Sequence, residues 1–108
     1  MSEDKPLYVL YAPLGQLSGN GQLRETVKER RNRKGNDVAF WYLSPELSNR
    51  FNLPGENIEA VVSEELSAIN WLRLRFGGER ITAQLNIEQL REQASELPPG
   101  PKFRNIGI

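Results

Sequence analysis

Cysteine and histidine are both absent from the 108 residues of this chain. Without cysteine there is no disulfide and no thiolate chemistry, and without histidine there is no imidazole to act as a general base. The common zinc sites use the same two residue types. A carboxylate-only metal site stays open, but the acidic residues are scattered among basic ones and form no tight cluster. We therefore expect a protein that is not an enzyme and has no cofactor.

The chain also lacks a net charge and a long apolar run. Its 14 basic and 14 acidic side chains balance, which gives no reason to expect nucleic acid or an anionic membrane as a partner. No apolar run approaches the ~18 residues that span a bilayer, so we expect no direct membrane insertion. The first residues are acidic and polar, unlike a signal or transit peptide. These features predict a cytoplasmic protein.

The length predicts a single domain over residues 1–108, with a core at about 7–97 and a polar tail at 98–108. Four short segments are rich in β-branched and aromatic residues, which favours strands. Three of them are mostly apolar and predict buried strands, whereas the last alternates and predicts a strand nearer an edge. In chain order, the predicted strands cover residues 7–12, 37–43, 58–62 and 79–85.

Helical signals separate these strands. The helix expected at 22–34 has Leu23 and Val27 on one face and many basic residues on the others. The clearest helix follows Ser63, which we predict to be its N-cap, and ends at Gly77. Its predicted apolar face is made of Leu66, Ile69, Leu72 and Phe76.

A last helix is predicted after Asn86, with an apolar stripe of Leu90, Ala94 and Leu97. A short helical turn is expected after Ser44. The first six main elements then follow the order β-α-β-β-α-β. This order predicts an α+β fold, in which a four-stranded, mainly antiparallel sheet carries the packed helices and a C-terminal helix is added.

Three sequence blocks resemble one family, the accessory proteins of the magnesium-protoporphyrin IX monomethyl ester oxidative cyclase of cyanobacteria and chloroplasts. They keep the family's order and roughly its spacing. The blocks are YVLYA (8–12), ETVKERRNRKGNDVAFW (25–41) and AVVSEELSAINWLRLR (60–75).

The resemblance implies a non-catalytic accessory or assembly protein of chlorophyll biosynthesis that binds the diiron oxidative cyclase subunit. It implies a location in the cytoplasm, or at the thylakoid membrane through the partner. By the same resemblance, Phe40 and Arg75 match the family's cyclase-contacting surface. The family usually has an acid where this chain has Ala39, and the C-terminal helix is an addition. A divergent paralogue, acting as a protein- or RNA-binding module on the same fold, is therefore the alternative.

The candidate partner-binding residues are two aromatics and two arginines, the residue types that dominate interface energies. Phe40 or Trp41 would supply a buried anchor, and Arg73 or Arg75 a planar fork for a carboxylate. Phe40 and Trp41 are neighbours on a strand, so they point to opposite faces. Trp71 is expected in the core rather than at a contact. A homodimer, weak porphyrin binding and the role of the tail stay open.

Overall fold

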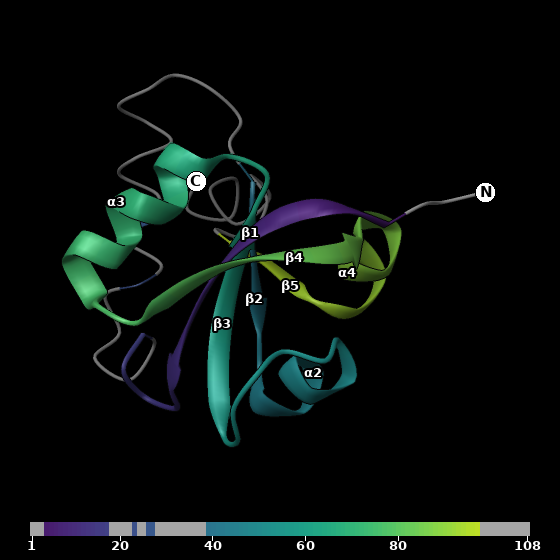
Figure 1. Ribbon diagram of the computed structural model, residues 1–108, viewed down its shortest axis with the longest axis horizontal. Helices are drawn as coiled ribbons and strands as arrows, with labels where there is room; N and C mark the ends of the chain where they lie inside the picture. Colours follow the sequence, from purple (N-terminus) through teal and green to yellow (C-terminus); the bar gives the residue numbers. More distant parts are fainter. Residues whose placement is uncertain (1–3, 18–22, 24–25, 28–38, 98–108) are drawn as a thin grey trace, which may run out of the picture.

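The computed structural model of the chain describes residues 4–17, 23, 26–27 and 39–97 (Figure 1). Strands dominate the described part, and three helices connect or follow them. The elements are β1 (Asp4–Pro13), β2 (Phe40–Leu43), α2 (Pro45–Arg50), β3 (Ile58–Ser63), α3 (Leu66–Phe76), β4 (Glu79–Asn86), α4 (Ile87–Gln93) and β5 (Ser95–Leu97).

The strands form one sheet in the order β4-β1-β3-β2-β5, and every neighbouring pair is antiparallel. The connection from β3 through α3 to β4 passes over β1, which separates the two strands in the sheet. This is the split β-α-β arrangement that the predicted element order implies. The predicted α+β fold and its four antiparallel strands are confirmed, with β4 at an edge as expected. The fifth strand, β5, was not predicted.

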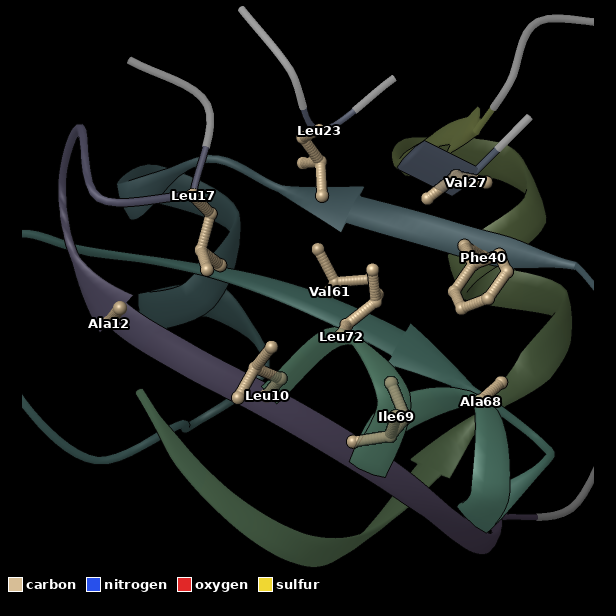
Figure 2. Close-up of a cluster of buried hydrophobic side chains, with 10 residues drawn as sticks. All are labelled: Leu10, Ala12, Leu17, Leu23, Val27, Phe40, Val61, Ala68, Ile69 and Leu72. Carbon is tan, nitrogen blue, oxygen red and sulfur yellow. The ribbon is translucent and has the colours of Figure 1, made fainter. Parts of the chain in front are cut away.

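Apolar residues line both faces of the central strands. On β1, Leu10 and Ala12 point to one face and Leu7 and Val9 to the other, because successive side chains of a strand alternate. The first face is covered by α3 and by Leu23 and Val27 from the connection to β2, as Figure 2 shows. The buried side chains of this face are Leu10, Ala12, Leu17, Leu23, Val27, Phe40, Val61, Ala68, Ile69 and Leu72.

The second face packs against α2 and α4, so the sheet lies between two layers of helix (Figure 1). Ser44 caps α2 as expected, because its Oγ accepts a hydrogen bond from the amide of Leu47. The buried side chains of this second face are Leu7, Val9, Trp41, Leu43, Leu53, Ile58, Ala60, Val62, Leu85 and Leu90.

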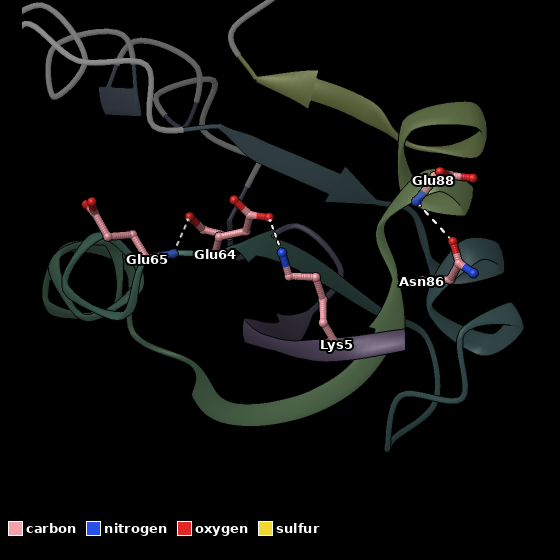
Figure 3. A network of polar contacts seen from close by, with 6 residues as sticks. Lys5, Glu64, Glu65, Asn86 and Glu88 are labelled. Carbon is pink, nitrogen blue, oxygen red and sulfur yellow. Dashed lines mark hydrogen bonds and ion pairs between the residues drawn. The ribbon is translucent and has the colours of Figure 1, made fainter. Parts of the chain in front are cut away.

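The start of α3 differs from the prediction. The helix begins at Leu66, and Ser63 is the last residue of β3. Ser63 Oγ still accepts a hydrogen bond from the amide of Glu65 at 3.2 Å, but it does so in the turn before the helix. Glu64 lies before the helix and pairs with Lys5 of β1 at 3.1 Å (Figure 3). Leu66 is 39% exposed and does not belong to the buried face that was predicted for it.

The last helix is shorter than predicted. Asn86 caps it as expected, with Oδ1 accepting from the amide of Glu88 at 3.0 Å (Figure 3). The same oxygen accepts from the amide of Gln89 at 3.1 Å. The helix ends at Gln93, however, and residues 95–97 form β5 against β2. The edge of β2 carries backbone donors and acceptors that need partners, and residues 95–97 supply them as a strand. Another helical turn would leave these groups of β2 to water. The prediction of Ala94 and Leu97 in a helical stripe was therefore wrong.

Two predicted segments lie largely outside the described residues. Of the helix at 22–34, the structure describes Leu23, Thr26 and Val27, all with helical backbone. Leu23 and Val27 are both buried in the core, as their predicted common face requires. The polar tail at 98–108 lies outside the described residues. Of the strand predicted at 37–43, residues 40–43 are confirmed.

One carboxylate lies fully buried inside the sheet. Glu59 of β3 accepts hydrogen bonds from the amides of Gly15 and Leu17 through Oε2, at 2.9 and 2.7 Å. Its Oε1 accepts from the Tyr42 hydroxyl at 2.7 Å. A buried carboxylate is stable only when donors replace its lost water. Glu59 therefore ties the turn after β1 to the centre of the sheet.

This network predicts a large loss of stability for Glu59→Gln. The side-chain NH2 group of glutamine is a donor, and it would face the amides or the hydroxyl that now donate to the carboxylate. We expect the free energy of unfolding to fall by ~2 kcal/mol or more. Tyr42→Phe should lower it by about 1.5 to 3 kcal/mol, measured by urea denaturation.

Tyr8→Phe is the matched control. Tyr8 lies on the same face of the sheet, and its hydroxyl makes no hydrogen bond within the described residues. We expect it to change stability by less than about 0.5 kcal/mol. Equal effects of the two tyrosine variants would contradict the role given to Glu59.

Two glycines separate α3 from β4 and allow a tight return of the chain. Gly77 has φ of +76° and its amide donates to the carbonyl of Arg73, which ends the helix. Gly78 has φ of +101°, and a Cβ built on it would lie 2.8 Å from the carbonyl oxygen of Tyr11. The strand that follows can approach β1 this closely only because position 78 has no side chain.

Gly78→Ala should therefore destabilise the fold through both backbone strain and a steric clash. Gly15→Ala is the matched control, because Gly15 has φ of +98° but open space around its Cβ position. We expect Gly15→Ala to lower the free energy of unfolding by about 1 to 2 kcal/mol through strain alone. Gly78→Ala should lower it by at least ~1 kcal/mol more. If chemical denaturation gave equal losses, the close approach to Tyr11 would not be the cause.

Candidate protein-docking site

The two candidate aromatic anchors both lie in the core. Phe40 is 0% exposed and packs on the α3 face, whereas Trp41 is 4% exposed and packs on the opposite face. Their predicted divergence to opposite faces is confirmed. Neither side chain reaches the surface in this structure, so direct contact with a partner would require the core to open. Their roles as anchors stay predictions.

The two candidate arginines lie on the last turn of α3 and are both exposed. Arg73 Nε donates to the carbonyl oxygen of Gly78 at 3.3 Å, so this side chain is used in the turn that follows the helix. Arg75 points elsewhere, and its guanidinium carbon lies 4.5 Å from the centre of the Trp71 ring. The structure thus separates the arginines into one that closes the turn and one that lies over an aromatic ring.

The stacking on Trp71 orients Arg75. A guanidinium over an indole face gains roughly 0.5 to 1 kcal/mol at an exposed site, and the planar group keeps its edge free for hydrogen bonds. No carboxylate of the described chain pairs with Arg75. The positive charge of Arg75 is therefore available for a carboxylate on another molecule.

Leu74 adds an apolar group to the same part of the helix. It is 85% exposed, more than the other exposed large hydrophobic residues of the described chain, Leu14 and Leu66. Trp71, Leu74 and Arg75 follow the i, i+3, i+4 spacing that places side chains on one side of a helix. We call these three residues the α3 outer surface.

The helix itself is held firmly, so the α3 outer surface is rigid. Ala68, Ile69 and Leu72 are fully buried on its inner side (Figure 2). Asn70 is linked to β4 through a hydrogen bond from Arg80, and Gln16 Nε2 donates to the carbonyl of Phe76 at 3.0 Å. Rigid presentation lowers the ordering cost of binding.

The arrangement suits recognition of a protein rather than catalysis. An exposed leucine, a half-buried tryptophan and an oriented arginine provide apolar area together with one directed charge. Sequence reasoning named Arg75 as a candidate and did not name Leu74. It expected Trp71 in the core, and the structure shows this side chain partly buried against the core cluster. The signal for Leu74 was present, because it is an apolar residue on the side of the helix opposite to Leu72.

Other kinds of site receive little support from the described residues. Within the described ranges, no three acidic side chains gather where they could hold a metal ion. No helix among them is long and apolar enough to cross a bilayer. The α3 outer surface is therefore the strongest candidate for function in this part of the chain.

Comparisons with known proteins give a match only at the level of structure. No protein-family model matches the chain, and no curated protein matches its sequence.

Among solved structures, the chain resembles the Ycf54 protein from Synechocystis sp. PCC6803. The TM-score is 0.54 at 23% identity, over 76% of this chain and 87% of that protein. An alanine-to-glycine mutant of the same protein gives a TM-score of 0.53 at 24% identity, over 74% of this chain and 86% of the mutant. This chain therefore has the fold of the Ycf54 protein.

Proposed function

We propose that this chain is a non-catalytic accessory protein of chlorophyll biosynthesis. In this proposal it binds the diiron subunit of the magnesium-protoporphyrin IX monomethyl ester oxidative cyclase and uses the α3 outer surface to do so. Any association with the thylakoid membrane would come through that partner.

The agreement between sequence motifs and fold carries the proposal. The three blocks that resemble the cyclase accessory proteins were identified from residues alone, and Ycf54, whose fold the chain shares, belongs to that accessory family. The blocks also fall on structurally linked elements. The first lies in β1, the end of the second in β2, and the third runs from β3 through α3.

The mechanism that we propose is docking through one charged and two apolar groups. Arg75, held over Trp71, would present its planar edge to a carboxylate of the cyclase. Leu74 would be buried against an apolar patch beside that carboxylate. Phe40 supports this surface from within, because it belongs to the same buried cluster as Ile69 and Leu72 of α3.

The RNA-binding alternative is less favoured. Modules of that kind stack bases on aromatic side chains exposed on a sheet. Here Phe40 and Trp41 are buried, and Tyr8 and Tyr42 are partly buried against the core on the α3 face. A base would have to displace packed side chains to reach them.

The proposal predicts the effect of two substitutions on cyclase binding. Arg75→Ala should weaken binding of the purified diiron subunit by ~2 kcal/mol or more, a loss of about 30-fold in affinity. Leu74→Asp should weaken it at least as much, since it places a charge at the apolar centre and repels the partner carboxylate. Both positions are exposed, so circular dichroism and thermal unfolding should show a folded protein.

Arg91→Ala is the matched control, because Arg91 is an exposed arginine on α4 at the opposite face of the sheet. It should leave the affinity unchanged. Recovery of the cyclase by the tagged chain from a photosynthetic cell extract, with less recovery by Arg75→Ala, would support the same assignment. Binding that is equally strong for all three variants would refute the α3 outer surface, and no binding by the folded wild-type chain would refute the cyclase as partner.

A further inference from the structure

The two edges of the sheet differ in a way that points to an interaction. The edge at β2 is covered by β5, a strand of only three residues. The other edge is β4, which has eight residues, all paired with β1 on one side. Within the described residues, no strand lies on the other side of β4. A long free edge presents a row of backbone donors and acceptors that can pair with another strand.

The sequence of β4 does not protect this edge. Natural edge strands are usually blocked by proline, by a bulge or by charges along the strand. Both charges of β4, Glu79 and Arg80, lie at its beginning. Arg80 is turned back toward α3, where it donates a hydrogen bond to Asn70. The rest of the strand, residues 81–86, reads ITAQLN and contains no charge, no proline and no glycine.

The side chains of β4 are complementary to themselves. Its apolar residues Ile81, Ala83 and Leu85 lie on the face covered by α2 and α4, and its polar residues Thr82 and Gln84 lie exposed on the α3 face. Consider an antiparallel pairing of β4 with its own copy in which Ala83 faces Ala83. Ile81 then faces Leu85 of the copy, and Thr82 faces Gln84. Both faces of the joined sheet keep their character.

Charge also fits this register. Arg80 lies opposite the uncharged Asn86 of the copy and is separated from the other Arg80 by six positions along the strand. A shift by one residue would place apolar side chains on the polar face, which disfavours the shifted pairing. No like charges stand directly opposite each other, which is the arrangement that destabilises paired strands.

We propose that this chain forms a two-fold symmetric dimer in which β4 pairs antiparallel with β4 of a second copy, joining the two sheets into one. The occupant of this edge is a second copy of the chain, because the strand is self-complementary in sequence, face and charge. The dimer does not depend on cyclase binding, which is proposed for the α3 outer surface.

The symmetry gives a sharp test, because residue 83 faces itself across the two-fold axis. Ala83→Lys and Ala83→Glu should each abolish dimers by placing like charges within about 5.5 Å of each other. An equimolar mixture of the two variants should restore association as a mixed dimer. Sedimentation equilibrium measures this directly, since the average mass rises with concentration from the 12.3 kDa monomer toward twice that value.

Asn49→Lys is the matched control, because Asn49 is exposed on α2, which packs near β2 and β3 and away from β4. It should dimerise like the wild-type chain. Ala83→Cys provides a second measurement if a charge at this half-buried position disturbs folding. The chain has no cysteine of its own, so mild oxidation should link two copies through residue 83, whereas Asn49→Cys should stay largely monomeric.

Restored association in the mixture, together with cross-linking at residue 83, would support the proposal. A wild-type chain that stays monomeric at millimolar concentration would overturn the proposal. The edge of β4 would then be open to pairing with an extended segment of another protein. Association that persists in both charged variants would also overturn it, because the dimer would then use a different surface.

Discussion

The central strands β1 and β3 are covered on both faces, and this burial constrains the rest of the structure. Every side chain they place inside must be apolar or fully hydrogen-bonded. Glu59 meets the second condition through the amides of Gly15 and Leu17 and the hydroxyl of Tyr42. The turn after β1 is thereby fixed to the sheet, and Gln16 in that turn reaches the end of α3. Recognition is left to the outside of the helices and to the sheet edges.

Most of the fold followed from local patterns. Runs of β-branched and aromatic residues marked the strands, and helical spacing with a glycine stop marked α3. Two features did not follow, because both depend on contacts distant in sequence. Residues 95–97 continue a helical pattern but pair with the open edge of β2. Glu59 sits in an apolar strand, and only the folded turn after β1 supplies donors for its carboxylate.

The candidate site was predicted in part. Arg75 was named as a candidate through the resemblance and because arginine is one of the residue types that dominate interface energies. Its orientation over Trp71 could not be read from the sequence, since side-chain direction depends on packing. Leu74 was missed although it lies outside the apolar face of α3, where an exposed leucine is informative. Because Phe40 and Trp41 of β2 are buried, the exposed candidate residues lie on α3.

The two tryptophans allow the most direct test of docking through α3. Trp71 belongs to the α3 outer surface, whereas Trp41 is buried on the opposite face of the sheet. Labelling with fluorotryptophan gives one fluorine resonance for each, assigned with Trp71→Phe. On addition of the purified cyclase subunit, docking through α3 should shift or broaden the Trp71 resonance far more than that of Trp41. A complex that forms while Trp71 is unaffected, or while Trp41 alone responds, would contradict it.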